Sequence, residues 1–372
     1  MKTRALMVAG ACICTALSAP PRALAQAVID PLQREALASR KIDRAVLLSA
    51  ASAGKRVVAV GERGIVALSD DQGKTWRQAK KVPTSVTLTI VKFVSEKSGW
   101  AAGHGGVVLQ TADGGENWVL KFDGNLAAQV MLKRAQAEQQ RGAPNAGVLV
   151  KQANALIQDG ADKPFFDLDA SDEKRAVVIG ASGLIFSTAD GGASWSAWGD
   201  RLENPRALNL YAIRRVGRNI LVAGEQGLVL HSSDDGDSFT KLKGPYEGSW
   251  FAAASQGPDE FVVAGLRGNA YRVSGDGKTW TSLEGMPPVS LTSAFPVSAN
   301  CTLLANQGGQ LFSVEKSQTR AVRLESPSLP PVTATLRQAG GAWLAFTMDG
   351  IFQLGQLKNA CSSASLLDNG KP

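Results

Sequence analysis

The fold is decided by residues 180–195, which read GASGLIFSTADGGASW. A glycine pair, Gly180 and Gly183, is followed by an apolar run and then by Thr-x-Asp-x-Gly-x-x-Trp, which ends at Trp195. The same sixteen-residue unit, with the same internal offsets, starts again at Gly61, Gly103 and Gly224. Self-similarity of this kind is the sequence signature of a repeat architecture.

Three weaker copies extend the repeat. The copy from Gly265 to Trp280 keeps both glycines, Gly277 and the tryptophan, but loses the serine at its expected offset and carries its acid at Asp276. Units starting at 306 and 347 keep the second glycine and the apolar run without the acidic turn. Successive starts are 42, 77, 44, 41, 41 and 41 residues apart, which indicates seven units and one insertion of roughly 35 residues.

Each unit is expected to form four short strands. In the second unit these are residues 90–94, 100–103, 107–110 and 118–122, separated by glycine-rich turns. A period near 40 with four strands and recurrent Gly and Trp predicts propeller blades, whose apolar faces are buried against neighbouring blades. We therefore expect an all-β protein, with a seven-bladed propeller of four-stranded blades over residues 26–372.

The Ser/Thr-x-Asp-x-Gly-x-x-Trp segment is an Asp box, and its chemistry is local. The short acid can accept hydrogen bonds from nearby backbone N–H groups, glycine supplies the positive φ, and the aromatic ring inserts between blades. The alternative, a calcium loop at residues 234–237, lacks the ligand spacing and distal glutamate of such loops. The residues assigned this structural role are Asp71, Trp76, Asp113, Trp118, Asp190, Trp195, Asp234, Phe239 and Trp280.

The chain begins like an exported protein. Lys2 and Arg4 precede an apolar stretch from Ala5 to Leu17, and Ala23-Leu24-Ala25 supplies small residues at a cleavage site, which together predict a signal peptide over residues 1–25. Lipidation at Cys12 is the alternative. Cleavage at 25 would lower the net charge from +7 to +4, a mild basicity that indicates solubility rather than nucleic-acid binding. The expected location is the periplasm.

Two cysteines, Cys301 and Cys361, would remain in the mature chain. In an oxidising compartment a single disulfide is the natural expectation, and two free thiols are the alternative.

The Asp boxes resemble the bacterial neuraminidase repeat, and the longer unit resembles the photosystem II stability/assembly factor family. The unit at residues 180–195 looks much like a blade of that family. The resemblance implies an extracytoplasmic seven-bladed scaffold that contacts membrane-protein assemblies. In bacteria without photosynthesis it implies a propeller that accompanies envelope or export machinery. The insertion and the two worn units depart from the photosynthetic members, so we expect the non-photosynthetic, proteobacterial type.

Catalysis is not expected. The sialidases that share the Asp box use a tyrosine nucleophile, an acid and an arginine triad. The tyrosines available here are Tyr211, Tyr246 and Tyr271, and Glu247 follows Tyr246, but the early Arg-Ile-Pro-type signature is missing. Two histidines, His104 and His231, cannot assemble a metal cluster, and no cofactor motif is present. The sequence therefore favours a monomeric, non-enzymatic binding protein, with a secreted glycan-binding or sialidase-like protein as the alternative.

The partner-binding surface is expected on the face that gathers the Gly-x-x-Gly loops and the connectors between blades. Arg201 and Arg206 fall in the connector before the fourth unit and are expected to share this face, whereas Arg218 should turn to the other one. Ordinary solvated turns are the alternative for each loop. The candidate partner-binding residues are Glu62, Arg63, His104, Arg201, Arg206, Glu225 and Arg267, and the remaining loop tips are Ser182, Gln226, Gln307 and Asp349.

The insertion, residues 125–163, is expected to form a helical hairpin. Leu126, Val130 and Ala137, and then Leu149, Ala153, Leu156 and Ile157, follow helical spacing, and residues 141–145 break the run. We expect the hairpin to stand on the rim of the loop face, and packing on the propeller flank is the alternative.

Overall fold

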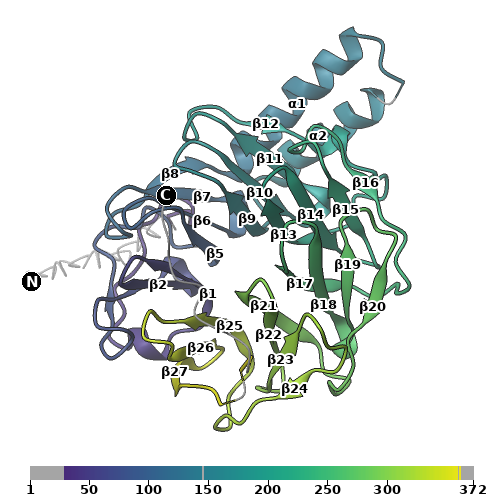
Figure 1. Cartoon of the computed structure of the whole chain (residues 1–372). Coiled ribbons are helices and arrows are strands. Elements are labelled where there is room, and N and C mark those ends of the chain that lie inside the picture. The colour runs from purple at the N-terminus through teal and green to yellow at the C-terminus, as the bar shows by residue number, and fades with distance from the viewer. Residues whose placement is uncertain (1–28, 145, 359, 362–372) are drawn as a thin grey trace, which may run out of the picture.

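The computed structural model describes residues 29–144, 146–358 and 360–361, so the expected signal peptide and Cys12 lie outside the described residues. The chain folds into seven antiparallel sheets arranged in a ring, with two helices projecting from the ring (Figure 1). This confirms the predicted seven-bladed propeller with four-stranded blades.

The sheets follow one another along the chain. The first contains β1 (Leu47–Ala53), β2 (Arg56–Gly61), β3 (Val66–Ser69) and β4 (Arg77–Gln78), and the second contains β5 (Leu88–Phe93), β6 (Gly99–Gly103), β7 (Val108–Thr111) and β8 (Val119–Phe122). The third contains β9 (Phe165–Ala170), β10 (Ala176–Gly180), β11 (Ile185–Thr188) and β12 (Ser196–Ala197), and the fourth contains β13 (Leu210–Val216), β14 (Asn219–Gly224), β15 (Val229–Ser232) and β16 (Thr240–Lys241). The fifth contains β17 (Trp250–Ser255), β18 (Glu260–Gly265), β19 (Ala270–Ser274) and β20 (Trp280–Ser282), and the sixth contains β21 (Leu291–Ser298), β22 (Cys301–Asn306), β23 (Leu311–Glu315) and β24 (Val322–Arg323). Within the described residues the seventh contains β25 (Val332–Arg337), β26 (Trp343–Thr347) and β27 (Gly350–Gly355).

The core lies between adjacent blades. The first strand of each sheet is innermost and contacts the first strand of the next, and β1 contacts β25 to close the ring. Trp100, Trp118 and Trp250 are among the largest side chains with essentially no exposure. Burial of such rings contributes several kcal/mol each by area, so the repeat itself supplies the core.

The glycine pair has a steric reason. A Cβ on the first glycine would meet the carbonyl before the innermost strand of its own blade, at 1.9 Å for Gly61. A Cβ on the second glycine would meet the connector to the next blade, at 2.1 Å from the Pro287 oxygen for Gly268. The second contact recurs even in the worn seventh unit, where Gly350 faces the Asp43 carbonyl of the segment that enters the first blade.

In the two degenerate units, which start at residues 306 and 347, a polar side chain replaces the first glycine. Asn306 is fully buried, and its Oδ1 accepts hydrogen bonds from the N–H groups of Gly308 and Gln310 at 3.0 Å each. Thr347 is likewise buried, and its hydroxyl bonds within the turn to Gly350 and Asp349. The turn is thus preserved by side-chain hydrogen bonds.

The Asp boxes form the predicted hairpin staples. In the third blade Asp190 accepts the N–H of Ser194 at 2.9 Å and the Thr188 hydroxyl at 2.9 Å, while that hydroxyl accepts the Gly192 N–H. The same pattern recurs around Asp71, Asp113 and Asp234. The indole N–H groups of Trp76, Trp118 and Trp280 donate to the box glycine carbonyl.

The fifth box corrects one expectation. Its hydroxyl is not lost, because Ser274 lies one residue later than the repeat spacing places it and donates to Asp276 at 2.6 Å. Serine and acid have shifted together, which shortens the turn by one residue.

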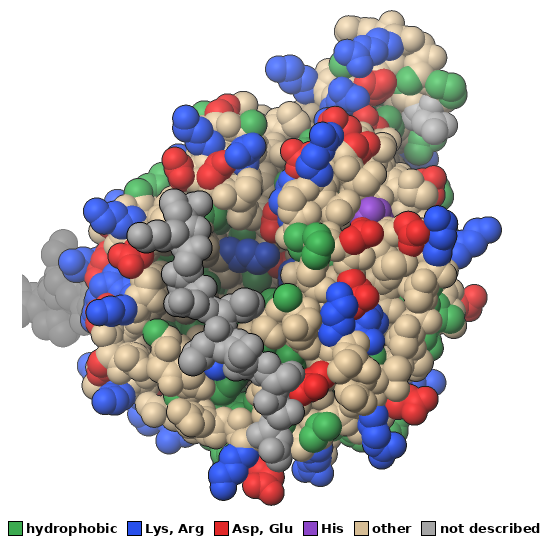
Figure 2. Space-filling model, in the orientation of Figure 1, with side chains coloured by type: hydrophobic (Ala, Val, Ile, Leu, Met, Phe, Trp, Pro, Cys, Tyr) green, Lys and Arg blue, Asp and Glu red, His purple; other side chains and the backbone are tan. Residues whose placement is uncertain are grey.

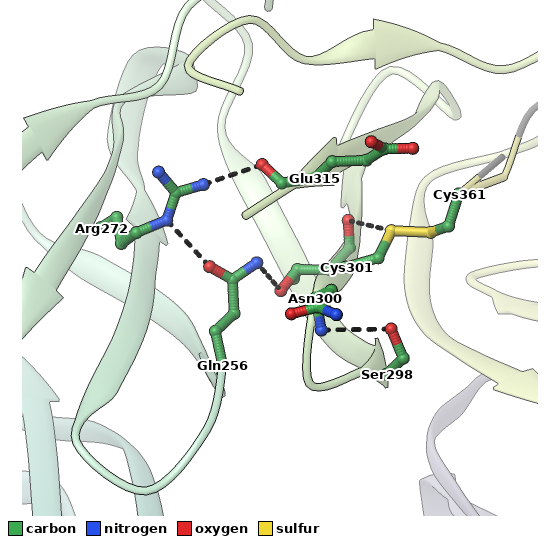
Figure 3. The surroundings of a disulfide bond; sticks show 8 residues. Gln256, Arg272, Ser298, Asn300, Cys301, Glu315 and Cys361 are labelled. Carbon is green, nitrogen blue, oxygen red and sulfur yellow. Dashed lines mark hydrogen bonds between the residues drawn. A yellow bond between two sulfur atoms is a disulfide. The ribbon is translucent and has the colours of Figure 1, made fainter. Parts of the chain in front are cut away.

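Cys301 and Cys361 are joined as a disulfide, with Cα atoms 6.0 Å apart. Cys301 begins β22 in the sixth sheet and Cys361 follows the seventh (Figure 3). Beside them, Gln256 donates to Thr302 at 2.9 Å and accepts from Arg272 at 2.9 Å, which ties the fifth blade to the sixth.

The insertion forms α1 (Gly124–Gln140) and α2 (Ala146–Asp159), between β8 and β9 along the chain. Asp123 caps α1 by accepting the Leu126 N–H at 2.9 Å. The buried face differs in part from the predicted one, because Leu126 and Ile157 are exposed while Ala127, Val130 and Met131 pack on the core between the second and third blades.

The hairpin lies partly on the rim of the loop face and partly on the propeller flank, so each of the two predicted placements holds in part. Its base adjoins the Gly-x-x-Gly loop of the second blade, since Gly124 lies against Gly106 and Ala161. Its body then contacts β12, the outer strand of the third sheet, and projects beyond the ring (Figure 1). No helix among the described residues is long and apolar enough to cross a bilayer.

Candidate partner-binding surface

We call the face that carries the Gly-x-x-Gly loops and the connectors between blades the mouth face, and the face that carries the Asp boxes the Asp-box face. The loops and connectors do share one face. Glu62 donates its N–H to the Val46 carbonyl at 3.0 Å, and Gly64 packs against the carbonyl of Thr84 in the next connector. The corresponding contacts recur around the ring.

The loop tips have a fixed shape. The third residue of the loop has positive φ even where it is not glycine, at Arg63 (54°), Ser182 (55°), Gln226 (53°) and Arg267 (57°). This conformation is disfavoured for L-residues by about 1–2 kcal/mol. It projects the third side chain into solvent, and all four residues are exposed.

Two of the predicted binding residues, Glu62 and Glu225, form hydrogen bonds within their own blade. The Glu62 carboxylate accepts the Val46 N–H at 3.2 Å, and the Glu225 carboxylate accepts the Asn209 N–H at 3.2 Å. Each bonds to the residue before the innermost strand of its own blade. Both carboxylates therefore hold the loop in place.

On the mouth face the chain itself covers the connector between the first two blades. Residues 31–36 pair with the connector there, since Ser85 donates to the Pro31 carbonyl and Ala36 to the Val82 carbonyl. Leu32 and Ala161 lie against Gly105, so both contact the loop that carries His104. The part of the mouth face left open by these contacts lies over the later blades.

The predicted arginine set divides between the faces. Arg206 bonds to Gln226 and lies on the mouth face as expected, and the Arg267 guanidinium makes no ion pair within the described residues. The prediction that Arg201 lies on the mouth face is wrong. Its guanidinium lies over the Trp198 ring, 4.6 Å from the centroid, and donates to Gly236 in the Asp box of the fourth blade at 2.8 Å.

The Arg201 side chain reaches the Asp-box face because the Gly236 carbonyl and the Asp237 carboxylate of that turn accept its hydrogen bond and pair with its charge. There it lines a cleft of about 510 Å³ between the third and fourth blades, together with Arg215 and Arg218. Arg215 is neutralised by Asp169 and Asp235, and Arg214 by Asp167. Most of this charge is therefore paired internally. Figure 2 shows basic side chains in the central hollow.

Two grooves flank the connector before the fourth blade, residues 203–208. The first, about 610 Å³, lies between the hairpin and this connector. Met131, Val148, Leu149 and Leu202 give it an apolar wall, and Arg134, Glu138 and Asp200 also line it. The Arg134–Asp200 ion pair, 2.7 Å, ties the hairpin to the chain just before the connector.

The second groove, about 620 Å³, lies on the other side of the same connector. Arg206, Lys241 and Lys243 line it together with Tyr246 and the acids Glu203 and Glu247. Asn204 and Pro205 belong to both grooves. The connector itself is rigid, because the Asn204 amide both accepts from and donates to Leu208.

The tyrosines and histidines show no catalytic grouping. The Tyr246 hydroxyl donates to the Leu266 carbonyl at 3.0 Å, and the Tyr211 ring lies between Phe166 and Phe251. Burial lowers the pKa of His231, which leaves it neutral at physiological pH. Among the described residues no three His, Cys, Asp or Glu side chains gather as metal ligands would.

The fold and its staples define the class: a β-propeller with Asp-box repeats. Residues 149–295, from α2 to β21, match the family described as Photosynthesis system II assembly factor YCF48. A Photosystem II assembly lipoprotein Ycf48 from Synechococcus sp. (strain CC9902) is 27% identical over 116 residues, which is 31% of this chain and about a third (35%) of that protein.

Solved structures show the same fold. YCF48 bound to a D1 peptide superposes with a TM-score of 0.62 at 15% identity, covering 87% of this chain and 96% of that one. YCF48 from Cyanidioschyzon merolae gives 0.60 at 16% identity, covering 84% and 96%. The WD40 propeller domain of Doa1 also gives 0.60, at 10% identity with 87% and 95% covered, so likeness at this level concerns the fold.

The family match over residues 149–295 and the curated relative support the resemblance to photosystem II assembly factors that the repeat units predicted, and the solved structures share the propeller fold.

Proposed function

We propose that this protein is a non-enzymatic assembly or accessory factor that binds an extracytoplasmic segment of a membrane-protein complex in the two grooves beside residues 203–208. The observation that carries the proposal is the juxtaposition of an apolar and a basic groove on one rigid connector, at the open part of the mouth face. Supporting it, a related propeller has been solved with a bound peptide.

The chemistry of the grooves defines the ligand class. An extended segment with apolar side chains would fill the first groove, and acidic groups would pair with Arg206, Lys241 and Lys243 in the second. The nearby Arg267 would add long-range attraction for the same acidic segment.

The proposed location is the periplasm, because the expected signal peptide would export the chain. A lipoprotein relative supports an extracytoplasmic, membrane-associated setting and keeps Cys12 as an alternative attachment point. A client outside photosynthesis is part of the same proposal, because the helical hairpin that walls the first groove is an insertion into the repeat.

The test compares two exposed positions on one helix. Val148 lines the first groove and Ile157 does not, although their exposed fractions are similar at 59% and 46%. Tagged Val148→Lys should recover at least about tenfold less client from detergent-solubilised envelope, since burying an unpaired ammonium at an interface costs more than 1.4 kcal/mol. Ile157→Lys should recover the wild-type amount. Equal recovery by both variants would remove the groove from the proposal.

A further inference from the structure

The innermost strands concentrate their charged side chains on one side of the ring. The fifth residue of the innermost strand is Lys92 in β5, Asp169 in β9 and Arg214 in β13. The other four blades place an uncharged residue at this position: Ala51, Ala254, Phe295 and Leu336. One level of the ring therefore carries two cations and one anion, on the second, third and fourth blades.

The arginines of this wall use both of its carboxylates. Asp167 pairs with Arg214, and Asp169 accepts a hydrogen bond from Arg215 at 2.8 Å. The Lys92 amine lies 3.8 Å from the Asp169 carboxylate, which is beyond the range of a hydrogen bond. Among the described residues no side chain or carbonyl is hydrogen-bonded to this amine. Lys92 is therefore a cation with open donors.

The wall carries an excess of positive charge. It contains three cations and two carboxylates, and the exposed Asp235, which also pairs with Arg215, belongs to the Asp box at the outer end of the fourth blade. The side chains of Lys92 and Arg214 are 29% and 22% exposed on strands that border the central hollow, where Figure 2 shows basic side chains. Burial lowers the pKa of Lys92, and the charge of Arg214 lowers it further. A negative charge in the hollow would relieve this repulsion between neighbouring cations.

From this arrangement we infer that the central hollow binds a small oxyanion, such as inorganic phosphate, between Lys92 and Arg214. The Lys92 ammonium offers N–H donors to such an anion. Arg214 bonds to Asp167 and to the Ile213 carbonyl through Nη1, and its Nε and Nη2 groups are the donors that remain for the anion. Charge-assisted hydrogen bonds of this kind are about twice as strong as neutral ones. The site is separate from the two grooves, whose linings centre on residues 203–208.

Isothermal titration calorimetry of the full chain with inorganic phosphate tests this site, at an ionic strength held constant with sodium chloride. Phosphate should bind saturably, with one site per chain. Lys92→Met should weaken binding at least about tenfold, because it removes a charge-assisted hydrogen bond. Lys97→Met changes an exposed lysine in the turn that follows the same strand and should bind phosphate like the wild type.

Two controls keep the result interpretable. Lys92→Met should fold, because Asp169 keeps its hydrogen bond to Arg215, and tryptophan fluorescence checks this. Lys92→Arg keeps the positive charge and should retain saturable binding.

Acetate titrated in the same way distinguishes the two chemical sources of an oxyanion. Saturable acetate binding that is weakened in Lys92→Met would support the site, with a carboxylate as its ligand. The absence of saturable binding of either anion to the wild-type chain would overturn the inference. Equal phosphate affinity in the wild type and in folded Lys92→Met would also overturn it, because the anion would then bind elsewhere.

Discussion

The steric account of the second loop glycine can be tested with two alanine substitutions. Gly268 and Gly217 have similar backbone angles, with φ of 74° and 58°. A Cβ on Gly268 would lie 2.1 Å from the Pro287 oxygen, whereas a Cβ on Gly217 would meet nothing within 4 Å. The pair therefore separates backbone strain from the clash with the connector.

Gly217→Ala should lower the free energy of unfolding by about 1–2 kcal/mol, the cost of the left-handed conformation. Gly268→Ala carries the same strain and must also displace a connector, which adds roughly 1–3 kcal/mol as in other overpacked sites. The gain from a stiffer unfolded chain is common to both substitutions and cancels in the comparison.

Urea unfolding followed by tryptophan fluorescence measures both values, provided that the slope m is unchanged. Equal losses of unfolding free energy in the two variants would show that the connector moves aside without an energetic cost. The second glycine would then be required for its φ alone.

Three further predictions follow from the staples, the disulfide and the grooves. Hydrogen bonds from Ser194 lower the pKa of Asp190 from 3.8 to about 2, so this carboxylate stabilises the fold above about pH 4 and the contribution is lost as pH falls towards 2. A thermal midpoint measured against pH should fall over that range, and it should fall less in Asp190→Asn; an identical slope in the variant would contradict the assignment. Thiol titration of the denatured, unreduced protein should find no free thiol from Cys301 and Cys361, and two reactive thiols would show that the bond is absent. Arg206→Glu should slow client association and make binding less sensitive to salt, whereas an unchanged salt dependence would exclude electrostatic attraction at the second groove.

The propeller could be predicted because its signals are local and repeated. Thr188, Asp190, Gly192 and Trp195 act within one turn, so their spacing in the sequence reports their contacts directly. The fifth box shows the limit of fixed offsets, because Ser274 and Asp276 shifted together and kept their hydrogen bond.

The surface could be predicted only in part. Arg201 follows the chain towards the mouth face, but its long side chain reaches an acceptor in the next blade, and such reach is invisible in a one-dimensional pattern. The Glu62 carboxylate is likewise engaged by backbone at Val46. One feature of the sequence did indicate the longer connector that carries Asn204 and Pro205. The interval of 44 residues before Gly224 exceeds the usual 41.

No feature of the sequence predicts that residues 31–36 cover the connector between the first two blades. Residues 31–36 lie outside the repeat, and only the fold brings Leu32 against Gly105. A convergence of seven equal loops was expected, but among the described residues the segment 31–36 packs beside the loop of the second blade.

Photo-crosslinking in the intact envelope tests whether the client binds in the two grooves. A benzophenone side chain would be placed at Val148 in the apolar groove, at Arg206 in the basic groove, and at Arg218 on the Asp-box face as the control. Val148 and Arg206 should trap the same membrane-complex subunit, and Arg218 should not. Trapping of that subunit from Arg218 alone would contradict binding in the grooves and would place the binding surface on the Asp-box face.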